Sequence, residues 1–448
     1  MKTARTFDMT TGNVEKNLLV FCMPLFFGQL FNQMYNMVDS LIVGKFVSAD
    51  ALAATGACSS LNFLFFAMSL GLSNGVGIII AQYFGAGNEE GIRKTIANAF
   101  FVLIGASLLA TLICTLVAER LLRFLNTPEE IIKDAVVYLV TTAVGIVFLA
   151  LYNVVSAVLR ALGDSKTPLV FLIISSFLNV FMDIFFVLTV KWGVFGVAFA
   201  TVISQFAAAV ICWAYALKKV EYFKFRKEYF KPDKRIIGHI FKLGVPMALQ
   251  SSMISISLII LQSVVNTFGA TVMAAYTISA KIDNLVSQFY SALAMALTTY
   301  AGQNKGAGRN DRIKEGLIKG SLIVFVYNLL IIPLCFFFSR QISSFFVSDA
   351  GVIEYGATAL RITAVLYFFL AMIYIPRGVL NGCGDAAFSM INGGTEVVCR
   401  IVFSHLFTVI PFIGVWGIWW AAGATWLVTS VVCVIRFACG RWKKIKVE

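Results

Sequence analysis

Two acids placed inside apolar segments are the residues of this chain best suited to chemistry. Asp39 ends a polar stripe at helical spacing, and the other members of that stripe are Gln29, Asn32 and Asn36. Asp183 ends a second stripe, whose other members are Ser175 and Asn179. Residues spaced by three or four positions share one face of a helix. Each stripe therefore presents a carboxylate and neutral polar groups on the helix face that packs against one neighbouring helix.

The chemistry expected of these acids is reversible cation binding. A carboxylate among apolar helices can take up and release a proton, and carboxylate and amide oxygens together can coordinate Na⁺. Either use would couple the protein to an ion gradient. The alternative is that Asp39 and Asp183 only hydrogen-bond to neighbouring helices and hold the bundle together.

The elements that must position these acids are membrane-spanning helices. The chain is 59% hydrophobic and 13% charged, and its mean hydropathy is +0.85. A soluble chain of 448 residues would need a larger polar shell, whereas apolar runs of about 20 residues can cross a bilayer as helices. The sequence predicts an all-α, polytopic membrane protein with twelve spans, at 17–42, 52–83, 94–117, 133–158, 168–190, 193–217, 237–266, 271–302, 315–338, 351–378, 388–410 and 414–437.

The formal net charge of +13 does not indicate a nucleic-acid partner. The basic residues lie in short loops between apolar runs and do not gather on one amphipathic face. This distribution follows the positive-inside rule. It predicts a multi-pass protein of the cytoplasmic membrane, with both termini and the central hydrophilic segment in the cytoplasm.

An internal repeat divides the chain into two related halves, because matching features recur about 221 residues apart. The matches are Pro24 with Pro246, Gln82 with Gln303, Gly85–Gly87 with Gly306–Gly308, and Gly163-Asp164 with Gly384-Asp385. We predict an N-terminal lobe at 1–217, a cytoplasmic linker at 218–236 and a C-terminal lobe at 237–448. Six spans per half make both halves enter the membrane in the same direction, so a pseudo-two-fold axis along the membrane normal relates them. Asp164 and Asp385 are each expected to cap the next helix or to face water at the cytoplasmic ends of the helices.

The acids in the apolar segments of the second half have a base nearby in sequence, unlike those of the first half. Glu396 has Arg400 one turn later, and Asp283 has Lys281 nearby in sequence, though on a different face of the helix. We expect these acids to be structural because each has a base close by. The repeat counterparts of Asp39 and Asp183 lie near Leu261 and Ser404, so the repeat itself does not require the first-half acids.

Other polar residues at membrane depth are candidates for a substrate cavity. They are Asn32, Tyr35, Asn36, Asn153, Gln205, Gln262, Tyr276 and Gln288. Each of them could instead form a hydrogen bond between helices. Together they indicate a hydrated interior.

Several motifs in order along the chain resemble the multidrug and toxic compound extrusion (MATE) transporters of the prokaryotic type. They are Pro24 followed by Asn36–Ser40, Gln82–Gly87, Leu159–Asp164, Asn179 with Asp183, and Gly302–Gly308. The resemblance covers essentially the whole chain. It implies a V-shaped antiporter of two six-helix lobes that exports organic cations or amphiphilic drugs against inward H⁺ or Na⁺.

The resemblance also implies site residues. The cation-binding roles in the first lobe fall on Asp39, Asn179, Asp183 and Thr201. Some Na⁺-coupled members carry a glutamate in the seventh span, where this chain has Gln250 and neighbouring serines. We therefore expect coupling in the first lobe, with H⁺ favoured over Na⁺, in a monomer.

Three other function classes fit the sequence less well. A flippase for a lipid-linked or polyprenyl-linked precursor would need a strongly cationic cavity, and little basic charge lies deep in the membrane. An enzyme is not expected, because the two histidines and nine cysteines form no catalytic or metal-binding motif. A channel would be expected to show a constriction motif. We predict no cofactor, and no metal apart from Na⁺ at the cation site.

Overall fold

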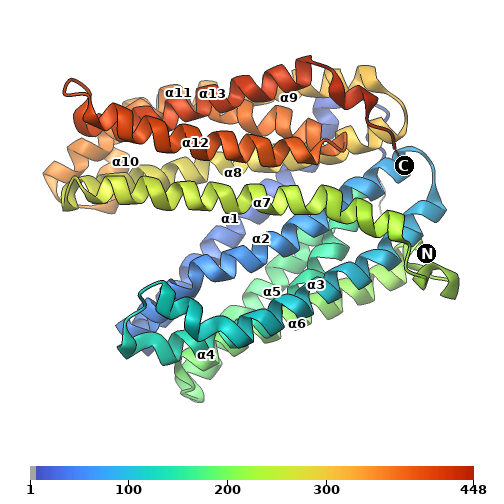
Figure 1. Cartoon of the computed structure of the whole chain (residues 1–448), viewed down its shortest axis with the longest axis horizontal. Coiled ribbons are helices and arrows are strands. Elements are labelled where there is room, and N and C mark those ends of the chain that lie inside the picture. Colours follow the sequence, from blue (N-terminus) through green and yellow to red (C-terminus); the bar gives the residue numbers. More distant parts are fainter. Residues whose placement is uncertain (1–6, 448) are drawn as a thin grey trace. The chain divides into compact units, whose positions relative to one another are not determined.

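The computed structural model describes residues 7–447, which fold into helices without any strand (Figure 1). The all-α prediction is confirmed. The α-helices are α1 (Val14–Ile42), α2 (Ala49–Gly85), α3 (Glu89–Phe124), α4 (Glu129–Ala161), α5 (Lys166–Ile184), α6 (Gly193–Lys219), α7 (Lys234–Asn266), α8 (Ala270–Gly306), α9 (Asn310–Phe337), α10 (Ser339–Phe346), α11 (Ala350–Gly382), α12 (Ala386–Val409) and α13 (Gly417–Ala438).

Each predicted span corresponds to one long helix, and α10 is the short exception at 8 residues. By length and composition, 10 helices among the described residues could cross a membrane. The two long helices outside that set are α8 and α12. They carry ionisable residues near their middles, namely Asp283 in α8 and Glu396 with Arg400 in α12. Polar residues there lower the mean hydropathy without shortening the helix.

The described chain packs as two compact units. Unit 1 comprises Met23–Ala248 and the described end of Met1–Asp8, and unit 2 comprises Met9–Cys22 and Leu249–Glu448. These units differ from the predicted lobes in one respect. The first turns of α1 pack in unit 2, and the first turns of α7 pack in unit 1. The lobe boundaries read from the sequence stay a prediction.

Small residues bring helices into close contact in unit 1. A Cβ atom added at Gly75 on α2 would lie 2.9 Å from the backbone nitrogen of Gly244 on α7. A Cβ at Gly71 would lie 2.7 Å from the backbone nitrogen of Ala248. Lipid provides little hydrophobic drive between helices, so close backbone packing of this kind stabilises the α2–α7 crossing.

The α8–α11 crossing in unit 2 is built in the same way. A Cβ atom added at Gly378 on α11 would lie 2.5 Å from the carbonyl oxygen of Ala294 on α8. The Thr298 hydroxyl donates to the carbonyl oxygen of Gly378 at 3.0 Å. This contact fixes α8 against α11 and so sets the separation of side chains further along both helices.

An N-terminal strap, defined here as Met9–Gly12, docks on the ends of α8 and α9 in unit 2. The backbone N–H of Met9 donates to Gln303 Oε1 at 2.8 Å, and Asn304 Nδ2 donates to the Met9 carbonyl at 3.2 Å. Arg309 donates to the Thr10 carbonyl at 2.7 Å, and Arg312 donates to the Gly12 carbonyl at 3.1 Å. Met9 is fully buried. The strap therefore attaches the start of α1 to unit 2.

Each of the two Gly-Asp pairs follows the end of a helix, but only one aspartate caps the next helix. Gly163 and Gly384 both have positive φ. Asp164 Oδ1 accepts from the backbone N–H groups of Lys166 and Thr167. Asp385 instead forms an ion pair with Arg436 at 2.8 Å, so the capping prediction is wrong there. A cationic side chain on α13 outcompetes the backbone N–H groups for this carboxylate.

Candidate functional site

Asp39 on α1 and Asp183 on α5 meet inside unit 1. Their carboxyl groups are hydrogen-bonded to each other. Asp183 has no exposed surface, and Asp39 is half-buried. Two ionised carboxylates have no donor to share, so a hydrogen bond between them requires one proton on the pair. The sequence predicted two acids in one half but did not predict that they touch.

The crossing of α1 and α5 positions this acid pair. A Cβ atom at Gly28 would lie 3.3 Å from Leu169 Cδ1, so the glycine lets the two helices approach. The rings of Phe31 and Phe177 pack at a centroid distance of 5.8 Å. A π-helical turn follows each acid, at Val43–Val47 after α1 and at Phe185–Thr189 after α5. Such turns are frequent at functional sites, because the helix can change its hydrogen-bonding register there.

The other predicted cation-binding residues lie beside the acid pair. Asn179 Nδ2 donates to Thr201 Oγ1 at 3.5 Å, which joins α5 to α6. Tyr35 lies one turn before Asp39, forms a hydrogen bond with Thr201, and is within electrostatic range of both acids. Tyr138 of α4 is also within range of both acids. Carboxylate, amide and hydroxyl oxygens are thus gathered in one place, and their assignment as cation ligands stays a prediction.

No basic side chain neutralises Asp39. It forms no ion pair within residues 7–447, and its Oδ1 atom has no hydrogen-bond partner there. The charge that acts on Asp183 is the carboxylate of Asp39. The described residues also contain no group of three His, Cys, Asp or Glu side chains that could hold a metal ion. Cation exchange at this pair stays a prediction.

The predicted substrate-cavity residues are distributed over both units. In unit 1, Asn153 donates to Ser69 Oγ at 3.3 Å, and Gln205 lies against Gly145 of α4. In unit 2, Gln262 bonds to Asn266 and Gln288 bonds to Asn284, both at 2.8 Å. Tyr276 is half-buried on α8, Asn32 is half-buried on α1, and Asn36 is exposed. Their common role in one cavity stays a prediction.

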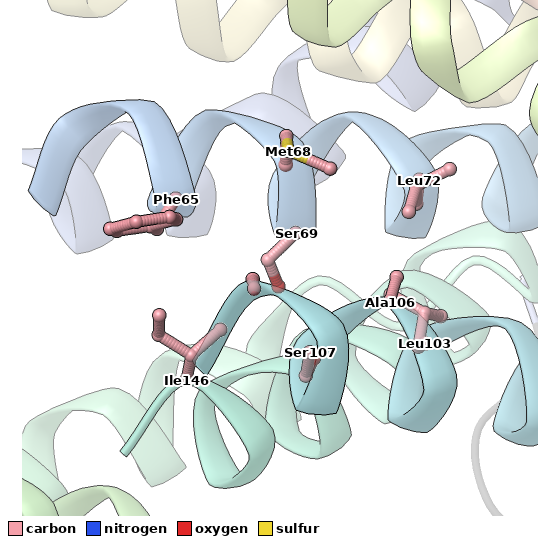
Figure 2. Close-up of a pocket in the computed structure, with 9 residues that line it drawn as sticks. Phe65, Met68, Ser69, Leu72, Leu103, Ala106, Ser107 and Ile146 are labelled. Atoms are coloured by element: carbon pink, nitrogen blue, oxygen red, sulfur yellow. The ribbon is translucent and has the colours of Figure 1, made fainter. Parts of the chain in front are cut away.

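A small pocket lies between α2, α3 and α4 of unit 1 (Figure 2). Its lining is mostly apolar and consists of Phe65, Met68, Ser69, Leu72, Leu103, Ala106, Ser107, Ala110 and Ile146. It holds at most about 240 Å³ of space, below the roughly 300–1,000 Å³ of typical ligand sites. We assign it no part in substrate binding.

A polar cluster in unit 2 was not predicted from the sequence. The Tyr367 hydroxyl of α11 donates to Asp283 Oδ1 of α8 at 2.7 Å. Lys281 does not pair with Asp283 within the described chain, and its Nζ lies 5.7 Å from the ring centroid of Phe346. The interpretation of Asp283 as an acid paired with a nearby base is therefore wrong. Residues two apart in a helix face different directions, so closeness in sequence gave no contact.

The pairing of Glu396 with Arg400 is confirmed. Arg400 donates to Glu396 Oε1 at 2.7 Å on α12, and both residues are at least nine-tenths buried. The pair lies in unit 2 with Asp283, and Arg400 is within electrostatic range of that acid. The signal that could have revealed the cluster is the set of membrane-depth tyrosines Tyr276, Tyr367 and Tyr374, because each brings a hydroxyl that needs a partner.

A sequence profile described as MatE matches the chain at residues 24–185 and again at 246–406, one match in each predicted half. The two matches cover more than half of the chain. The chain belongs to the MatE family. The named relatives of this MatE protein include a "probable multidrug resistance protein YpnP" of Bacillus subtilis, which is 31% identical and covers 99% of both chains. A "probable multidrug resistance protein NorM" of Thermotoga maritima is 24% identical, and the alignment covers 96% of this chain and 94% of the Thermotoga protein.

Solved structures of MATE transporters share the fold. A structure titled as the outward-facing conformation of a multidrug resistance MATE family transporter aligns with a TM-score of 0.92 and 23% identity, over 99% of this chain and 100% of that chain. A structure titled as MATE in the bent conformation aligns with a TM-score of 0.92. The MatE protein is thus a multi-pass membrane transporter, as predicted, and its family is not one of enzymes.

Proposed function

We propose that this transporter is a cation-coupled antiporter that exports organic cations or amphiphilic drugs by alternating access. It works as a monomer in the cytoplasmic membrane, with both termini in the cytoplasm. The relatives named as multidrug resistance proteins support the substrate class. The observation that carries the coupling is the contact of Asp39 with Asp183, because Asp39 has no base beside it.

The acid pair can couple transport because its charge depends on the cation that it holds. With one proton the two carboxyl groups share a hydrogen bond, and after loss of that proton they repel each other. Protonation therefore changes the preferred separation of α1 and α5. The π-helical turns that follow both acids provide backbone that can adjust to that change. We favour H⁺ over Na⁺, because two carboxyl groups in contact can share one proton.

The flippase alternative has less support. A pyrophosphate headgroup calls for cationic side chains that are free to bind it. Arg400 is already paired with Glu396, and Arg377 lies over the ring of Tyr374 at 4.8 Å. Recovery of a lipid-linked glycan with the purified protein would reverse this ranking.

The test is uptake of a fluorescent organic cation into everted vesicles, with the proton and sodium gradients collapsed separately. Asp39→Asn and Asp183→Asn should each reduce gradient-driven uptake to the level seen without a gradient. Asp134→Asn is the matched control, because Asp134 is exposed near the start of α4. Unchanged uptake in both site variants would refute the coupling assignment. Loss of uptake on collapse of the sodium gradient alone would replace H⁺ by Na⁺.

A further inference from the structure

The polar cluster in unit 2 has a charge that its own residues do not cancel. Tyr367 donates a hydrogen bond to Asp283, and Thr363 also hydrogen-bonds to this carboxylate. Both partners are neutral, so they orient the carboxylate without neutralising it. A carboxylate at membrane depth costs several kcal/mol on the scale of helix insertion, roughly 2.5–3.5 kcal/mol, unless something compensates it. Such an acid is expected to have a function.

The cations near Asp283 are occupied by other groups. Arg400 lies within electrostatic range of Asp283, but it is bonded to Glu396. The charges of Arg400 and Glu396 cancel, which leaves Asp283 as the net negative charge of this group of three. A positively charged ligand would restore neutrality here.

A buried donor in the same cluster indicates that the ligand also carries a hydrogen-bond acceptor. Arg400 is 5% exposed, and its Nε atom has no hydrogen-bond partner among the described residues. A guanidinium has five N–H donors, and a buried donor left unpaired is unfavourable. A ligand that carries a hydrogen-bond acceptor near its positive charge could satisfy Nε.

Aromatic groups complete the site. Tyr276 lies two turns before Asp283 on the same face of α8 and is within electrostatic range of both Asp283 and Arg400. Tyr276 is half-buried, so part of it remains accessible. Aromatic faces attract organic cations. An organic ammonium group suits this arrangement better than a metal ion, since residues 7–447 contain no group of three metal-binding side chains.

The repeat counterpart of Asp283 in unit 1 is not an acid. At the offset of about 221 residues, Asp283 corresponds to Asn62 and Thr363 corresponds to Thr142. In unit 1 the Thr142 hydroxyl bonds to Asn62 Oδ1 at 3.2 Å, so the same helix contact exists there with a neutral amide. Packing at this position therefore does not require a charge. The carboxylate of Asp283 needs another explanation.

We propose that the polar faces of α8, α11 and α12 form a substrate site in unit 2, where Asp283 binds the positive group of an organic cation and Arg400 Nε binds an acceptor on the same molecule. This inference rests on the proposed antiport function, and it separates the substrate charge from the coupling ion held in unit 1. The site thus favours organic cations that carry an ester, amide or carboxyl oxygen.

The experiment measures binding to the purified full-length chain without any gradient, so that it does not depend on transport. Tetraphenylphosphonium serves as a cation without an acceptor, and rhodamine 123 serves as a cation with an ester carbonyl. Asp283→Asn should raise the Kd of both probes about 10- to 100-fold, the usual effect of losing a charge-assisted interaction. Asp134→Asn should leave both Kd values unchanged.

Two further variants make the result decisive. Asp39→Asn should abolish gradient-driven uptake, because it removes one acid of the proposed coupling pair in unit 1, while the purified variant should still bind both probes. If Asp283→Asn does not fold, Asp283→Glu keeps the charge and should retain binding of both probes. Unchanged binding in folded Asp283→Asn, or loss of binding in folded Asp283→Glu, would overturn the proposal. Failure of uptake in the wild-type protein would instead refute the antiport function and leave the binding result intact.

The acceptor half of the proposal has its own test. The double variant Glu396→Gln with Arg400→Gln removes the guanidinium while keeping the pair neutral. It should weaken rhodamine 123 binding about 5- to 10-fold, as expected for loss of one hydrogen bond, and should leave tetraphenylphosphonium binding unchanged. Equal effects on both probes would contradict the role of Arg400 Nε.

Discussion

The two units use the same helical repeat but distribute their charges differently. In unit 1 the acids lie on α1 and α5, touch each other, and Asp39 has no base beside it. In unit 2 the repeat positions of these acids are neutral, at Leu261 and Ser404, and Asp283 of α8 is hydrogen-bonded to a tyrosine. A pair of touching acids changes its charge when it takes up a cation, whereas Asp283 has neutral hydrogen-bond donors as its partners.

The charges of α5 and α12 differ in the same way at single repeat positions. At the offset of about 221 residues, Ser175 corresponds to Glu396 and Asn179 corresponds to Arg400. The stripe that holds neutral groups beside Asp183 in unit 1 thus holds a closed ion pair in unit 2. In our proposals, the duplicated helix therefore serves cation binding in unit 1 and substrate recognition in unit 2.

The largest expected effect tests whether the unit 2 ion pair is structural. Glu396→Gln alone leaves Arg400 buried with no counter-charge and should destabilise the protein by about 3–5 kcal/mol. The double variant with Arg400→Gln should recover most of that loss. Thermal unfolding of the purified protein measures both. In unit 1, Asp39→Asn should not destabilise the protein, because the amide can donate to Asp183 in place of the shared proton. Destabilisation by Asp39→Asn would contradict this contrast between the two units.

The next effect tests the close helix contacts. Gly378→Ala places a methyl group against the Ala294 carbonyl and should cost about 1–3 kcal/mol through overpacking. Gly77 offers the matched position in unit 1, since its added Cβ would lie 3.4 Å from the Ala157 carbonyl. Gly77→Ala should therefore be tolerated. Equal thermal stabilities of the two variants would show that the α8–α11 crossing is no tighter than its unit 1 counterpart.

A smaller effect is expected at the hydroxyl groups. Tyr367→Phe removes a donor to a carboxylate and should cost about 1.5–3 kcal/mol, whereas Thr142→Val removes a donor to a neutral amide and should cost about 0.5–1.5 kcal/mol. Chemical unfolding of each variant against the wild-type protein gives the two values. A larger cost for Thr142→Val would indicate that Asp283 is neutral in the folded protein.

The smallest effect concerns an exposed pair at the start of α3. Lys94 lies 2.8 Å from Glu90 and lowers the pKa of that carboxyl group. A lowered pKa means that the folded state binds the proton less readily, so the contribution of the pair is present at neutral pH and is lost as the pH falls through the acid range. Both side chains are exposed and screened by salt. Glu90→Gln should therefore shift the unfolding temperature by little more than the measurement error at pH 7.

The spans could be predicted from the sequence because each requires only a long apolar run. The same criterion misses α10, which has 8 residues, several of them polar, between two longer runs. Its turns are stabilised by packing against α11, and Ser339 and Ser343 are buried there. Neighbouring helices supply that environment, and hydropathy does not describe it.

The candidate site could be predicted by residue type but not by partner. An acid in an apolar run is unfavourable in lipid and is therefore a candidate for function, so the sequence points to Asp39 and Asp183. Spacing along one helix assigns each acid to a face without indicating which other helix meets that face. For this reason the sequence does not indicate the partners of Asp283 and Asp385, which are Tyr367 at 84 residues and Arg436 at 51 residues along the chain.

The N-terminal strap has a consequence for biosynthesis. The partner of the Met9 backbone, Gln303, follows it by 294 residues. At the usual rate of about 5–20 residues per second, the ribosome needs roughly 15–60 s to supply it. During that time the strap lacks its docking surface, so it is accessible to chaperones and proteases. The strap is thus synthesised long before the surface on which it docks.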